Sequence, residues 1–135
     1  LDIDEVHKFI SEAFWAKGRS RDELISCIDG SFTLGLYCGN KQIGITRVIT
    51  DYTFFGYVCD VYIIEEFRNL GLGHFFMDCL FNHPKMKSLK FILESTFAQS
   101  LYYDFGFTKF ESADDWMIRP RPLKSPKGHR QLGPD

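Results

Sequence analysis

The chain has 135 residues, of which 44% are hydrophobic and 25% are charged, and its formal net charge is −2. This length fits one domain that can bury roughly two thirds of its unfolded surface. No apolar run approaches the roughly 20 residues of a membrane span, and an acidic body argues against nucleic acid as the main partner. We therefore expect a single domain with neither a membrane nor a nucleic-acid partner.

The cysteines and histidines give no pattern of a disulfide or metal site. The cysteines lie inside apolar segments without CxxC spacing, which is typical of reduced thiols in a cytoplasmic protein. The histidines are scattered, so no metal ligand set is expected. The four cysteines are Cys27, Cys38, Cys59 and Cys79.

Two amphipathic helices are predicted near the start of the chain. Asp2 and Ser20 each precede a glutamate by three positions, which is the pattern of a capping box, and apolar residues then recur at helical spacing. Gly18 would end the first helix, and Gly30 stands where a left-handed C-cap of the second belongs.

The rest of the chain alternates between strands and helices. A tight turn is expected at Gly39-Asn40, a helix from Gly71 to about Asn82, and a helix capped by Ser95 or Thr96 and ended by Gly106. The predicted strands cover residues 31–38, 41–50, 56–64 and 89–94, with a last pair at 107–111 and 116–119.

This order predicts an α/β (α+β) fold with a mixed sheet covered by helices on both faces. The globular domain would span residues 1–119. Residues 120–135 are basic and rich in proline and glycine, so they are expected to form an extended tail.

An Arg-x-x-Gly-x-Gly segment joins the strand at 56–64 to the following helix. We call residues 68–73 the glycine loop; it contains Arg68, Gly71 and Gly73. The first N–H groups of a helix have no intrahelical partner and carry partial positive charge, so this loop is suited to an anion such as a phosphate. The alternative is that the glycines serve only the geometry of the turn.

The glycine loop, followed by Leu101-Tyr102-x-x-x-Gly106-Phe107, resembles the GNAT superfamily of N-acetyltransferases, and the resemblance extends to about Arg119. It implies a GNAT-like acyl-CoA N-acyltransferase fold, acetyl-CoA as cofactor, and direct transfer of the acetyl group to a primary amine. The family usually begins with a strand before its first helices, and we expect this strand to be missing ahead of Leu1.

The resemblance also assigns residues to the cofactor. The strand before the loop would pair with the pantetheine arm through its main chain, and the loop and first helical turn would hold the pyrophosphate. Ser95 stands where many members carry a cofactor-binding asparagine. The implied set is Val61, Tyr62, Ile63, Arg68, Asn69, Leu70, Gly71, Leu72, Gly73, His74 and Ser95.

Tyr102 and Asp60 are the candidate catalytic residues. Tyr102 matches the family's general acid toward the coenzyme A sulfur, with Tyr103 as the competing candidate. Asp60 is the only charge in an apolar run, so it is either a base acting through water or a partner of Arg47. Several members place a glutamate base one position earlier, where this chain has Cys59.

The acceptor cannot be read from the sequence beyond a small-molecule or peptide amine. Aromatic walls suit a cation or an apolar group. A non-catalytic acyl-CoA-binding or sensing module is the main alternative function, a pure interaction domain is the third, and a homodimer stays open. The candidate acceptor contacts are Trp15, Arg19, Tyr52, Phe54, Phe55 and Trp116.

Overall fold

The computed structural model describes residues 1–11 and 18–122. It contains a four-stranded sheet with the order β1-β2-β3-β4. The first three strands are antiparallel, whereas β4 joins β3 in parallel, so the sheet is mixed as predicted. The strands are β1 (Phe32–Cys38), β2 (Lys41–Thr50), β3 (Phe55–Ile63) and β4 (Lys90–Leu93).

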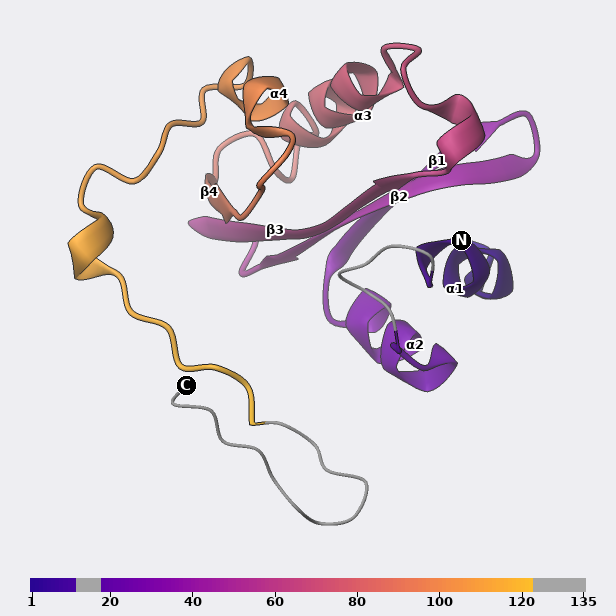
Figure 1. Ribbon diagram of the computed structural model, residues 1–135, viewed down its shortest axis with the longest axis horizontal. Coiled ribbons are helices and arrows are strands. Elements are labelled where there is room, and N and C mark those ends of the chain that lie inside the picture. Colours follow the sequence, from indigo (N-terminus) through magenta and orange to yellow (C-terminus); the bar gives the residue numbers. More distant parts are fainter. Residues whose placement is uncertain (12–17, 123–135) are drawn as a thin grey trace.

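Helices cover both faces of this sheet (Figure 1). The pair α1 and α2 lies on one face, and α3 and α4 lie on the other. Residues 42–48 of β2 are all buried, because both faces of this strand are covered. The helices are α1 (Ile3–Ile10), α2 (Arg21–Asp29), α3 (Leu72–Phe81) and α4 (Gln99–Tyr103), with short 3-10 helices η1 (Glu65–Phe67) and η2 (Ala113–Asp115).

The helix starts follow the predicted capping chemistry. Ser20 accepts the Glu23 N–H while the Glu23 side chain accepts the Ser20 N–H, which is a complete capping box. Asp2 accepts the Glu5 N–H at 3.2 Å, but its own N–H donates to Gln42 of β2 instead. None of the helices in the described ranges is long and apolar enough to cross a membrane.

The left-handed cap predicted at Gly30 is wrong. Gly30 has φ −92° and ψ 14°, because its N–H bonds to the Ser26 and Ile28 carbonyls and tightens the last turn of α2. The Ser31 hydroxyl then donates to the Cys27 carbonyl at 2.6 Å. The free carbonyls at the helix end are therefore satisfied without a left-handed residue.

The two faces of the sheet hold two parts of one apolar core. Val6, Ile10 and Leu24 come from α1 and α2 and are fully buried. Met77 and Leu80 come from α3 and are equally buried on the other side. Because β2 and β3 lie between these layers, they form a rigid support for the side chains they carry.

The strand β3 is paired on both sides for only half of its length. Its pairing with β4 runs from Phe55 to Val58, whereas its pairing with β2 continues to Ile63. A bulge between these two halves places Cys59 opposite no residue of β2. A bulge bends a strand, so β3 diverges from β4 here. Within the part of the chain that the structure describes, residues 60–63 have no strand on their β4 side.

The last two predicted strands are wrong. Residues 107–110 and 116–119 are irregular, and η2 lies between them. Figure 1 draws this segment as a loop with the short coil of η2 and no strand arrow, although side chains of the segment still contact β4, as Phe107 does Phe91. The acidic stretch 111–115 forms turns, and a strand without a neighbour cannot satisfy its backbone hydrogen bonds. The final helix is also shorter than predicted, since α4 begins after Ala98.

Candidate active site

A cavity of about 660 Å³ opens where β3 and β4 diverge. Its walls come from four parts of the chain: the residue before the N-cap of α2, the middle of β2 and β3, the end of β4, and α4 with the turn that precedes it. It brings Asp60 and Tyr102 to one site. The lining residues are Arg19, Arg47, Tyr57, Val58, Cys59, Asp60, Val61, Leu93, Glu94, Ser95, Thr96, Phe97, Ala98, Leu101 and Tyr102.

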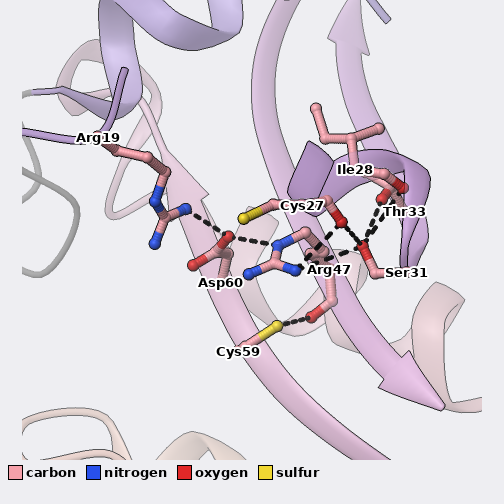
Figure 2. Close-up of polar contacts among 8 residues, drawn as sticks. All are labelled: Arg19, Cys27, Ile28, Ser31, Thr33, Arg47, Cys59 and Asp60. Atoms are coloured by element: carbon pink, nitrogen blue, oxygen red, sulfur yellow. Dashed lines mark hydrogen bonds and ion pairs between the residues drawn. The ribbon is translucent and has the colours of Figure 1, made fainter. Parts of the chain in front are cut away.

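Three of these side chains form what we call the Arg–Asp cluster: Arg19, Arg47 and Asp60. Asp60 Oδ2 accepts hydrogen bonds from Arg47 Nε at 2.7 Å and from Arg19 Nη1 at 3.0 Å (Figure 2). Arg47 Nη1 also donates to the Cys27 carbonyl and the Ser31 hydroxyl, at 3.3 and 3.5 Å. The cluster therefore ties β2 and β3 to α2 and to the residue that precedes it.

Burial strengthens the attraction between the charges of the Arg–Asp cluster, because little water screens them. The side chains of Asp60 and Arg47 are 2% and 7% exposed, whereas that of Arg19 is 20% exposed. Burial alone would lower the pKa of Arg47, but the hydrogen bond and the charge of Asp60 outweigh it and raise that pKa. The expected Arg47–Asp60 pair is thus present, and Arg19 is an additional partner that sequence reasoning did not assign to it.

Tyr102 faces the same cavity from α4. Its side chain is 7% exposed, and burial raises its pKa above the usual value, so the phenol keeps its proton at neutral pH. The chain turns back after α4 because Gly106 adopts a φ of +89°, which glycine tolerates. This turn packs Phe107 edge-on against the Tyr102 ring. Tyr103 is 47% exposed and does not line the cavity.

The glycine loop lies just beyond the free edge of β3. Asn69 and Gly71 have positive φ values of 62° and 80°, and Gly71 is the N-cap of α3. A Cβ built on Gly71 would meet no atom within 4 Å, so the main chain there is open to a ligand. Arg68 donates to the Ile63 carbonyl at 2.7 Å and stacks over the Tyr62 ring. The remaining guanidinium N–H groups of this exposed side chain can bind an anion.

Two further cofactor candidates lie nearby. Ser95 lines the cavity, and its hydroxyl accepts the Ala98 N–H at 3.1 Å, which shapes the turn before α4. His74 is exposed in the first turn of α3, with its ring 4.8 Å from that of Phe105.

Among the described acceptor candidates, Arg19 alone lines the cavity with Asp60 and Tyr102. Tyr52 lines a different cavity, and Phe54 is 76% exposed beside it in the β2–β3 hairpin, at the opposite end of β3 from the glycine loop. Trp116 stacks on Phe110, outside the cavity. Phe55 begins β3 and is half-buried, and Trp15 lies outside the described residues.

Sequence reasoning missed Tyr57 and Glu94, both of which line the cavity. Burial, and then the charges of Cys59, Glu94 and Asp60, raise the pKa of Tyr57. The parallel register of β3 and β4 pairs Val58 with Leu93, so Glu94 comes next to the bulge at Cys59. The sequence alone does not specify this register.

Comparison with known proteins agrees with this geometry. No protein-family model matches the chain. A crystal structure from Xanthomonas campestris, of a protein assigned to the GNAT family of acetyltransferases, is 32% identical with a TM-score of 0.84 over 90% of this chain and 87% of that one. A GNAT acetyltransferase from Elizabethkingia anophelis, solved with acetyl-CoA bound, is 16% identical with a TM-score of 0.61 over 89% and 80% of the two chains.

A curated protein from Gibberella zeae, assigned as the acetyltransferase FG08082, is 28% identical over 100 residues. The match covers 59% of this chain and 56% of that protein, so the chain spans about half the length of this relative. The identity and coverage of the Xanthomonas structure are sufficient to establish the family. The chain belongs to the GNAT family of acetyltransferases.

Proposed function

We propose that the chain is an acetyl-CoA-dependent N-acetyltransferase that transfers the acetyl group directly to a primary amine, without an acyl-enzyme. The observation that supports this most is the free edge of β3, which has the glycine loop at one end and Tyr102 across the cavity. The glycine loop, the free edge of β3 and Tyr102 follow one another in the order of the phosphate end, the arm and the thioester of such a cofactor.

The residues present fit that cofactor. The N–H groups at the start of α3 and the side chain of Arg68 suit the pyrophosphate. Within the described residues, no strand pairs with residues 61–63 on the β4 side of β3, and this strand edge suits the amides of a pantetheine arm. The fully open space at Gly71 leaves room for phosphate oxygens. Acetyl-CoA would supply the thioester.

Tyr102 would act as the general acid. Burial keeps its phenol protonated, and the hydroxyl can donate that proton to the departing sulfur as the bond between the carbonyl carbon and sulfur breaks. The attacking nitrogen loses a proton in the same reaction. Asp60 is the candidate to receive it through water, because its Oδ1 takes no hydrogen bond from the described residues.

A non-catalytic acyl-CoA-binding module is the second candidate, and one observation favours it. Cys59 occupies the position of the family's glutamate base, and burial raises the pKa of its thiol to about 11. A neutral thiol is a poor base at neutral pH. In this second reading the cofactor binds but no amine is acetylated.

Two measurements test the proposal. Calorimetric titration with acetyl-CoA should detect binding, and release of free coenzyme A thiol should depend on both the protein and an amine. Binding without thiol release for any amine would support the binding module. Absence of binding would contradict both readings and leave an interaction domain.

A further inference from the structure

We propose that the acceptor is a zwitterion, namely an amine with a carboxylate close to its amino group, as in a free amino acid. Arg19 would bind the carboxylate, and Asp60 Oδ1 would interact with the amino group through the water that carries its proton. This inference rests on the proposed function, because it names the acceptor class of the same cavity. It depends on the donor and acceptor atoms of the Arg–Asp cluster that the described residues leave unused.

Arg19 and Arg47 have different roles within the cluster. Arg47 is nearly buried; its Nε donates to Asp60 and its Nη1 to the Cys27 carbonyl and Ser31, whereas its Nη2 donates to none of the described residues. Arg19 is more exposed and uses Nη1 alone, on Asp60. Its Nε and Nη2 donate to none of the described residues. Arg47 therefore ties α2 to the sheet through two of its nitrogens, whereas Arg19 is more exposed and has two nitrogens that no described residue uses.

The main chain is anchored at the Arg19 carbonyl and at the residue that follows it, which restricts where the Arg19 side chain can lie. The carbonyl of Arg19 contacts His7 Nε2 of α1 at 2.8 Å. The next residue, Ser20, starts α2 through its capping box. Arg19 thus sits at the junction of two anchored helices, which limits the side-chain entropy lost when a ligand binds.

Asp60 supplies the complementary group. Its Oδ2 accepts both arginines, and its Oδ1 accepts no hydrogen bond from the described residues. In Figure 2, neither Oδ1 nor the second terminal nitrogen of Arg19 carries a dashed line. A free carboxylate oxygen beside a free guanidinium edge matches an amino group beside a carboxylate.

The charges that line the cavity favour the same class. Two arginines face two carboxylates, Asp60 and the exposed Glu94, so neither sign dominates. A simple amine would leave the free donors of Arg19 desolvated without an acceptor, which is costly in a partly buried site. A zwitterion pairs with both groups at once, so it should be preferred over an amine of the same shape.

The test is an acceptor panel built from matched compounds. Each amino acid is compared with its decarboxylated amine and its carboxamide, for example phenylalanine with phenethylamine and phenylalaninamide, by thiol release at fixed acetyl-CoA. We expect the best amino acid to exceed its own amine and amide about 10- to 100-fold in kcat/KM, because the lost hydrogen bond is to a charged group.

Arg19→Gln should remove this preference by raising KM for the amino acid more than KM for its matched amine, and acetyl-CoA affinity should change little. Arg21→Gln is the matched control, because Arg21 is exposed, pairs with Asp4 and does not line the cavity. The panel on the parent protein decides the question even if Arg19→Gln fails to fold.

The outcomes separate the inference from the proposed function. Amines without a carboxylate that match or exceed their amino acids would overturn the inference and leave the acetyltransferase intact. Acetyl-CoA binding without turnover of any amino acid would also overturn it. Absence of acetyl-CoA binding would remove the proposed function itself.

Discussion

The glycine loop follows β3 and the Arg–Asp cluster is centred on Asp60 within β3, yet the two sites are built on opposite principles. The loop is exposed and uses its main chain, with positive φ at Asn69 and Gly71. The cluster is largely buried and uses charged side chains from three distant segments. A change in the loop should therefore affect mainly ligand binding, whereas a change in the cluster should affect folding strongly.

A substitution at Tyr102 gives a third kind of effect, because it should lower the catalytic rate without changing folding or cofactor binding. Tyr102→Phe keeps the ring and its contact with Phe107 but removes the proton donor. Loss of a positioned general acid typically lowers the rate about 10²–10⁴-fold. We expect kcat to fall by this factor with unchanged acetyl-CoA affinity, measured by steady-state thiol release and calorimetry.

Tyr103→Phe is the control, since Tyr103 is exposed and lies outside the cavity. The parent rate should fall at high pH as Tyr102 ionises, and burial places this fall above the pKa of free tyrosine. The fall should be absent in Tyr102→Phe. Parental kcat in that variant, with chemistry rate-limiting, would make Tyr102 a packing residue.

Asp60→Ala should give the largest loss of stability. Removing the carboxylate leaves the buried guanidinium of Arg47 without its counter-charge, and breaking a buried pair in this way costs about 3–5 kcal/mol. Denaturant unfolding of parent and variant measures the difference in free energy of unfolding.

Asp4→Ala is the matched control, because the Asp4–Arg21 pair has a similar contact distance of 2.6 Å but both side chains are exposed. Its unfolding midpoint should stay close to that of the parent. Equal small effects of the two substitutions would show that the Arg–Asp cluster is not a structural anchor.

Features that depend on neighbouring residues were predictable from the sequence. Contacts between distant residues were predictable only where a side chain could be paired with few others. The glycine loop and both helix starts depend on neighbouring residues, so they could be predicted. The Arg47–Asp60 pair was one of two alternatives, because a lone carboxylate in an apolar strand needs a cation. The contact of Arg19 with Asp60 spans 41 positions and depends on how α1 and α2 pack, which periodicity does not reveal.

The errors have the same origin. Residues 107–111 and 116–119 have strand-like composition, but whether they form strands depends on a neighbour that the sequence does not specify. The aromatic residues of the β2–β3 hairpin were assigned to the acceptor because of their type and because this loop borders the acceptor groove in similar folds. The structure places Tyr52 in the β2–β3 turn, beyond the Thr50–Gly56 pair, where it lines a different cavity from that of Asp60.

Gly71→Glu tests whether the glycine loop binds the pyrophosphate. The carboxylate would stand where the pyrophosphate is proposed to bind, and the positive φ adds strain of about 1 kcal/mol. We expect acetyl-CoA affinity to fall by about 10–100-fold, on the scale of one unfavourable charged contact. The melting temperature should change only as much as the strain requires.

Gly39→Glu separates strain from binding. Gly39 also has a positive φ, +61°, with open space around its Cβ position, but it lies in the β1–β2 turn. Both variants should lose similar stability, and only Gly71→Glu should lose affinity. If Gly71→Glu binds acetyl-CoA like the parent, the glycine loop is not the phosphate site.

The smallest effect is expected at Cys59, where the cavity and the bulge of β3 meet. Burial raises the pKa of its thiol to about 11, so at pH 8 its thiolate fraction is roughly 100-fold lower than that of a thiol with pKa 9. Alkylation followed by mass spectrometry should therefore label the exposed Cys38 and Cys79 well before Cys59.

Acetyl-CoA should slow the labelling of Cys59 further, because Cys59 lines the cavity proposed to bind it. At a cofactor concentration ten times its Kd, about one protein in eleven is free by mass action, so the rate should fall about tenfold. Cys38 provides the internal reference, since it lies at the end of β1 and its rate should not change. Labelling of Cys59 that is insensitive to saturating acetyl-CoA would mean that the cofactor binds without covering the diverging edge of β3.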